Sequence, residues 1–161
     1  MKTGMLGICG ILAAAVVATS AIGDGHADKA IEAAVKARQS QMTLYSFNLG
    51  ILGGMAKGDI EYDADAATAA ARNLAALSQL DQSRLWPQGS DNVALGADKT
   101  AALPAIWETG STAGEKGMAL ASAAIDLEQV AGDGLDALQG AMGAVGKSCG
   151  SCHESYRQKN E

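Results

Sequence analysis

Residues 134–158 read GLDALQGAMGAVGKSCGSCHESYRQ, and their apolar residues recur with the period of an α-helix. Near the end of this segment Cys149 and Cys152 stand three residues apart, and His153 follows the second cysteine directly. The sequence therefore predicts a C-terminal helix that carries two thiols and an imidazole close to its end.

Three other segments show the same helical period. The first spans about residues 28–55 and ends toward Lys57-Gly58. The second begins at residues 63–64, where Asp63 can cap the helix, and ends near residue 80. The third begins near residue 103, where Pro104 suits an early helical position. It is interrupted and continues from about residue 114. We therefore expect four helices and no strand.

The composition agrees with this helical pattern. Of the 161 residues 48% are apolar, and most of these are Ala and Leu, which favour helices. Residues 81–100 contain Pro and Gly and predict a long connection, which in a compact domain is often functional. Four amphipathic segments bury their apolar faces by packing together, so the predicted fold is an all-α, antiparallel four-helix bundle in a single domain.

The first 27 residues have the pattern of a cleaved signal peptide. Lys2 is followed by an uncharged apolar run over residues 6–17 and then by small residues, which place the cleavage site between residues 21 and 27. A membrane anchor is the competing interpretation, but the run is shorter than the ~20 apolar residues that span a bilayer. We expect a periplasmic protein, residues 28–161, with no integral membrane segment after cleavage.

Charge limits the partners of this chain. A formal net charge of −6 disfavours nucleic acid and anionic membrane surfaces, which would repel the protein at neutral pH. Basic or neutral redox proteins are compatible with this charge.

The segment Cys149-Gly-Ser-Cys152-His153 matches the attachment sequence for c-type haem. On a helix the two thiols lie on nearly one face, and the next residue turns its imidazole toward the ring that they hold. A thioredoxin-like site is an alternative, but it normally opens a helix after a strand. A zinc site would need more ligands, and the only other histidine is His26 in the predicted signal region. The motif predicts one haem c, bound covalently by Cys149 and Cys152, with His153 as an axial ligand of the iron.

Together with three other features, this motif makes the chain similar to the class II cytochromes c, which include cytochrome c prime and its low-spin relatives. The resemblance covers almost all of the mature chain. Besides the segment 149–157, it rests on Arg38-Gln39, Lys57-Gly58 and Leu103-Pro-Ala-Ile-Trp107. It implies a helix bundle that holds its haem near the C-terminus.

The resemblance also implies two roles in the first helix. The residue four positions after the arginine points at the iron, and in this sequence it is Met42. A methionine opposite a histidine raises the reduction potential of haem and suits electron transfer, although Met at helical spacing more often only fills space. Arg38 shares this helix face, and the resemblance implies that it contacts a haem propionate.

These residues support two hypotheses of function. The first is a one-electron carrier that is not an enzyme and whose iron is bound by His153 and Met42. The second is a five-coordinate cytochrome that binds nitric oxide or carbon monoxide, with Met42 as a gate on the distal side. A peroxidase is disfavoured because no distal histidine is present to act as acid or base.

In several relatives the bundle pairs into a dimer through its first two helices, so the resemblance allows a homodimer here, although helices packed within one chain have the same composition. The apolar and small residues that could allow this contact are Leu49, Ile51, Leu52, Gly53 and Gly54.

Overall fold

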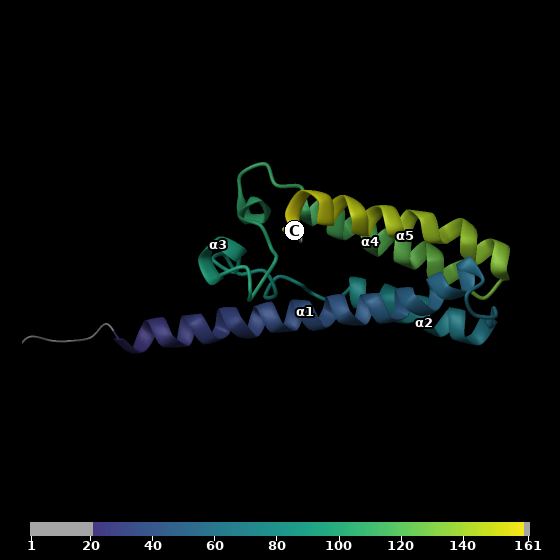
Figure 1. Ribbon diagram of the computed structural model, residues 1–161, viewed down its shortest axis with the longest axis horizontal. Helices are drawn as coiled ribbons and strands as arrows, with labels where there is room; N and C mark the ends of the chain where they lie inside the picture. Colours follow the sequence, from purple (N-terminus) through teal and green to yellow (C-terminus); the bar gives the residue numbers. More distant parts are fainter. Residues whose placement is uncertain (1–20, 160–161) are drawn as a thin grey trace, which may run out of the picture.

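The computed structural model describes residues 21–159, and it is built of helices (Figure 1). In chain order these are α1 (Ala21–Lys57), α2 (Ala64–Ser78), α3 (Asn92–Leu95), the 3₁₀ helix η1 (Pro104–Trp107), α4 (Ala113–Val130) and α5 (Leu135–Tyr156). The four long helices pack as an antiparallel bundle, which confirms the predicted all-α class and architecture.

Local sequence signals set the ends of the first two helices. α1 stops at Lys57, and Gly58 follows with a φ of +80°, a left-handed conformation that glycine adopts without strain. Asp63 then caps α2, because its side chain accepts a hydrogen bond of 2.8 Å from the backbone N–H of Ala66. Both features agree with the sequence prediction. The predicted signal peptide lies for the most part outside the described residues, so its cleavage stays a prediction.

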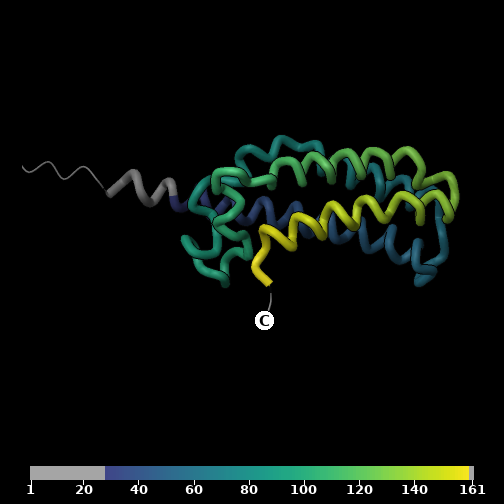
Figure 2. The backbone as a smooth tube through the Cα atoms, turned by 90° about the horizontal axis from the view of Figure 1, so that it is seen from above, coloured from purple at the N-terminus to yellow at the C-terminus, as the bar shows by residue number. Residues whose placement is uncertain are grey.

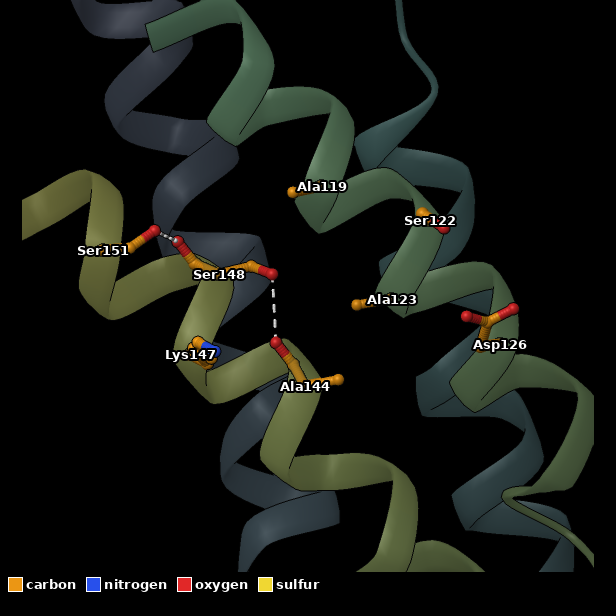
Figure 3. A pocket seen from close by; sticks show the side chains of 8 residues that line it. All are labelled: Ala119, Ser122, Ala123, Asp126, Ala144, Lys147, Ser148 and Ser151. Atoms are coloured by element: carbon orange, nitrogen blue, oxygen red, sulfur yellow. Dashed lines mark hydrogen bonds between the residues drawn. The ribbon is translucent and has the colours of Figure 1, made fainter. Parts of the chain in front are cut away.

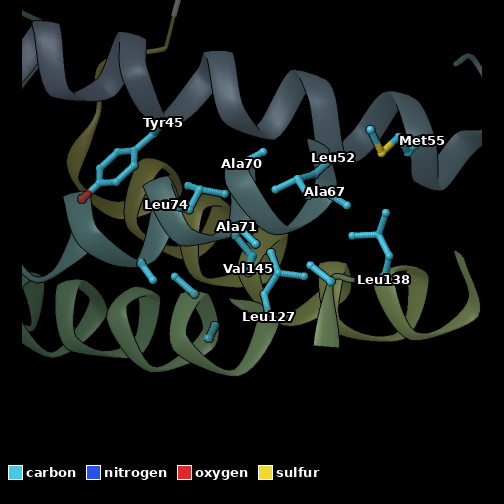
Figure 4. Close-up of a cluster of buried hydrophobic side chains, with 14 residues drawn as sticks. Tyr45, Leu52, Met55, Ala67, Ala70, Ala71, Leu74, Leu127, Leu138 and Val145 are labelled. Atoms are coloured by element: carbon cyan, nitrogen blue, oxygen red, sulfur yellow. The ribbon is translucent and has the colours of Figure 1, made fainter. Parts of the chain in front are cut away.

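The core lies between α1, α2, α4 and α5 (Figure 4). α2 contributes a stripe of small buried residues at three- and four-residue steps, which lets its backbone approach the neighbouring helices closely. The largest apolar side chains that are fully buried are Leu52, Leu74, Leu127, Leu138 and Val145. Leu52 was expected on a dimer surface, and that expectation is wrong because the side chain is fully enclosed in the core.

The connection between α2 and α4 is more ordered than the sequence predicts. It contains the short helix α3, and Pro104 opens η1 instead of a long helix. The carbonyl of Ala101 accepts a 2.7 Å hydrogen bond from Gln158, and the carbonyl of Tyr156 accepts one of 3.0 Å from Leu103. Figure 2 shows this connection beside the last turn of α5. These contacts join the connection to the end of the bundle that carries the cysteine motif.

Over the described part of the chain, no helix is both long enough and apolar enough to cross a membrane.

Candidate functional site

The two predicted haem-binding cysteines lie in the last third of α5. Cys149 and Cys152 are both half-buried and free, and Cys149 packs against the hydrophobic core. Burial is the main cause that raises the pKa of each thiol above its ordinary value. Both sulfur atoms therefore lie in a partly apolar environment beside the core.

His153 follows the motif and lies at the surface, at the edge of a shallow depression. Partial burial, and in second place the charge of Arg157 one turn later, lower the pKa of His153 below its ordinary value. A neutral imidazole has a free lone pair, which is the form that binds a metal. The depression is lined by Gly150, His153, Glu154, Arg157, Gln158 and Lys159.

Two contacts fix how α1 and α5 are aligned. Gln139 of α5 donates a hydrogen bond of 2.7 Å to the carbonyl of Ala56 in α1. One turn further along, a Cβ atom built on Gly53 would lie 4.0 Å from Cε of Met142. In an antiparallel pair, a move toward the start of α1 corresponds to a move by the same number of residues toward the end of α5. Gly53 precedes Ala56 by three residues and Met142 follows Gln139 by three residues, so both contacts belong to one alignment of the two helices.

The register places Met42 opposite His153. Met42 precedes Gly53 by 11 residues and His153 follows Met142 by 11 residues, which on each helix is about three full turns. Both residues therefore lie on the facing sides of their helices, at the same level of the bundle. Figure 1 shows the two helices diverging toward this end. Accordingly, 37% of Met42 is exposed, and His153 is exposed as well.

Two buried residues of α1 lie close to Met42 in the chain, and the sequence interpretation did not assign either of them to the site. Gln41 donates hydrogen bonds of 2.8 Å to the carbonyl of Leu77 and 3.2 Å to the hydroxyl of Tyr45. Burial is the main cause that raises the pKa of Tyr45 to about 12, and the electrostatic effect of the nearby Cys149 sulfur is second. The spacing of Gln41 and Tyr45, four residues apart on the buried face of an amphipathic helix, is the signal that could have identified them.

Arg38 is only 3% exposed, and it is directed toward the connection between α2 and α4. Its guanidinium donates hydrogen bonds of 2.6 Å to the hydroxyl of Ser90, 2.5 Å to the carbonyl of Ser90 and 2.7 Å to the hydroxyl of Thr100. Its Cζ atom also lies 4.8 Å from the centre of the Trp86 ring. Arg38 thus binds this connection to α1, one turn before Met42, and its contact with a propionate stays a prediction.

A second, larger groove lies between α4 and α5, on the side of α5 that carries Ser148 and Ser151 (Figure 3). It has a volume of about 440 Å³ and is lined mainly by small side chains. Apart from these it contains Asp126 and Lys147, and none of the predicted site residues line it. We therefore place the site at the motif, where the chemistry-bearing side chains gather, and not in this groove.

The arrangement fits a covalently bound haem. Two thiols lie three residues apart on one helix, an imidazole follows them directly, and a thioether, that of Met42, lies on α1 at the level that the helix register gives to His153. Thiols supply the attachment points of haem c, and imidazole and thioether are ligands of haem iron. A helix bundle with this attachment motif is a c-type cytochrome of the helix-bundle class.

Comparison with known proteins defines the family. The family described as Cytochrome C' matches residues 33–157. The chain is 46% identical over 131 residues to cytochrome c-554 of Cereibacter sphaeroides, a match that covers 81% of this chain and 84% of the relative. It is 41% identical over 128 residues to cytochrome c' of the same organism, which covers 80% of this chain and 85% of the relative. The chain belongs to the cytochrome c' family, and its cofactor is covalently bound haem c.

Solved structures agree with this assignment. Cytochrome c' from Rhodobacter Spheriodes superposes with a TM-score of 0.76 at 39% identity, over 81% of this chain and 98% of that one. The nitric oxide complex of a mutant cytochrome c prime from Alcaligenes xylosoxidans gives a TM-score of 0.69 at 34% identity, over 81% and 97%. The predicted family, fold and cofactor are therefore confirmed.

Proposed function

We propose that the protein is a periplasmic carrier of single electrons, with no catalytic cycle, whose haem iron is bound by His153 and Met42. The observation that supports this proposal is the alignment of α1 and α5 near Gly53–Met142 and Ala56–Gln139, which, extended by three turns along both helices, brings the levels of Met42 and His153 together. Both side chains are exposed, at the end of the bundle toward which the two helices diverge.

When bound, the haem supplies an iron that alternates between the ferric and ferrous states. The chain's own residues set its surroundings. Cys149 and Cys152 would hold it by two thioether bonds, so that it is retained at a partly open end of the bundle. A thioether opposite an imidazole favours a high reduction potential, which suits a carrier. The buried hydrogen bonds of Gln41 and Arg38 keep α1 fixed around Met42.

The visible spectrum and a redox titration of the holoprotein test this proposal. We expect a low-spin spectrum in both oxidation states and a reversible titration that fits a single electron. A high-spin spectrum of the unaltered protein would rule out Met42 as a ligand and would leave the electron-carrier function without its structural support.

The second candidate function is binding of nitric oxide or carbon monoxide by five-coordinate iron, with Met42 as a gate. The exposure of Met42 favours it, because a side chain that is not held by its neighbours can move aside. Some similar structures were solved as gas complexes of cytochrome c prime variants, two with nitric oxide and one with carbon monoxide. Prompt binding of carbon monoxide by the reduced protein would support this function, and an unchanged spectrum would exclude it.

Export is part of the proposal. The run of apolar residues after Lys2 and the small residues before position 28 support a cleaved signal peptide. Mass spectrometry of the protein purified from its native compartment tests this, since a cleaved chain begins between residues 22 and 28.

We also propose that two copies pair through α1 and α2, and one similar solved structure is described as a cytochrome c' with ligand-controlled dimer dissociation. Leu49 packs against the core and Gly53 faces α5, so neither is available to a second copy. Leu44 and Phe47 are available, since 48% and 65% of these side chains are exposed on the outer face of α1.

A further inference from the structure

The net charge of the protein is concentrated at one end of the bundle. Residues 57–72 and 126–136 together carry eight carboxylates and two cations, a formal charge of −6 that equals the charge of the whole chain. The carboxylates are Asp59, Glu61, Asp63, Asp65, Asp126, Glu128, Asp133 and Asp136, and the cations are Lys57 and Arg72.

These two segments form a single surface far from the haem-binding motif. The hydroxyl of Tyr62 donates a hydrogen bond of 2.9 Å to the carbonyl of Ala131, and Arg72 lies 3.6 Å from Glu128. His153 follows Asp136 by 17 residues of one helix, which corresponds to roughly 25 Å along its axis. An electron would have to travel this distance to leave through the acidic end, and tunnelling slows exponentially with distance.

The end of the bundle that carries the motif has cations beside His153 and Cys152. Arg157 and Lys159 line the depression beside His153. Lys116 lies near enough to Cys152 for its charge to oppose in part the burial that raises the pKa of that thiol. Among the residues that the structure describes, none of these three cations takes part in an ion pair. Glu154 is the carboxylate that lines the same depression. These cations are therefore free to pair with carboxylates of another molecule.

From this separation of charge, we propose that the motif-bearing end is the docking surface for a redox partner whose own docking surface is rich in carboxylates. The proposal rests on the electron-carrier function and adds the chemistry of the partner. It reverses the expectation from net charge, which favoured basic or neutral partners. A basic partner would be drawn to the acidic end, where the haem is remote, whereas an acidic partner is repelled there and turned toward His153.

Voltammetry of the holoprotein on gold electrodes at low ionic strength tests the proposal, with monolayers that end in carboxylates or in amines. On carboxylates we expect adsorption with fast electron exchange. On amines the protein adsorbs through its acidic end, and exchange is at least about tenfold slower. K116E and K159E should each lower exchange on carboxylates by about fivefold or more. K57E, the same charge change at the acidic end, should leave it within about twofold.

Three results would overturn the proposal: faster exchange on amines, an effect of K57E equal to that of K159E, or no adsorption on carboxylates. A redox titration in solution with small mediators separates these results from a failure of the proposed function. A protein that titrates reversibly in solution but exchanges faster on amines is still a carrier, and only the acidic partner is then wrong. A protein that does not titrate as a one-electron couple contradicts the carrier function itself.

Discussion

Arg38 of α1 and Ser90 of the connection to α4 are joined by two hydrogen bonds, one to the hydroxyl and one to the carbonyl of the same serine. Replacement of Arg38 by alanine leaves these buried acceptors without a donor. We therefore expect Arg38→Ala to lower the free energy of unfolding by about 2 to 4 kcal/mol, measured by chemical denaturation of the holoprotein.

Arg38→Lys is the matched variant. Lysine keeps the positive charge but lacks the planar guanidinium that donates hydrogen bonds to Ser90 and Thr100 at the same time. It should fall between the wild type and Arg38→Ala in stability. If both variants were as stable as the wild type while their reduction potential shifted, Arg38 would act on the haem propionates and not on the connection.

Tyr45 makes the protein sensitive to alkaline pH. Its pKa is raised to about 12 in the folded protein from 10.0 in an exposed tyrosine, mainly by burial. The hydroxyl is thus protonated in both states below pH 10, and above that pH ionisation favours the unfolded chain. Stability is therefore lost as the pH rises from about 10 to about 12. Tyr45→Phe should move alkaline unfolding, followed by circular dichroism, to higher pH.

Tyr156→Phe is the control for this effect, because hydrogen bonds with Ser111 and Thr112 lower the pKa of Tyr156. It should bring no gain in alkaline stability. An equal gain in both variants would show that the raised pKa of Tyr45 is not the cause.

Leu127 tests the packing of the core, where its side chain has no exposed surface. Leu127→Ala removes buried methyl groups between α4 and α2, and we expect a loss of about 2 to 5 kcal/mol in the free energy of unfolding. Leu80→Ala is the same substitution at a side chain that is 55% exposed, and it should change stability by less than about 0.5 kcal/mol. Equal losses would mean that the core is not where the structure places it.

Phe47 tests the proposed dimer. Phe47→Asp places a charge on the exposed outer face of α1, where burial against a second copy would leave it without a partner. Sedimentation should show the wild type as a dimer and the variant as a monomer with an unchanged helical spectrum. A variant that still sediments as a dimer would place the contact elsewhere.

Features with local causes could be predicted from the sequence. The end of α1 at Lys57 and the cap of α2 at Asp63 depend on residues within one turn, and both agree with the structure. The start of the third helix could not be predicted, since Pro104 suits a 3₁₀ turn and a first helical turn equally well. The pairing of Ala102 with Arg157 depends on residues far apart in the chain.

The same limit applies to the site. The spacing of Cys149, Cys152 and His153 was sufficient to predict haem attachment, because all three lie on one helix. The partners of Arg38 could not be predicted, because Ser90 and Thr100 follow it by 52 and 62 residues. The role of Met42 toward the iron was implied by family resemblance alone and stays a prediction, and the register of α1 and α5 near Gly53 and Met142 is compatible with it.

The long-wavelength charge-transfer band of the ferric holoprotein, which arises from a bond between sulfur and haem iron, tests the central claim most directly. The wild type should show this band, and Met42→Ala should lose it and become high-spin, with Met118→Ala as the control because Met118 is exposed on α4. If the wild type lacks the band, or Met42→Ala retains it, Met42 is not the ligand opposite His153.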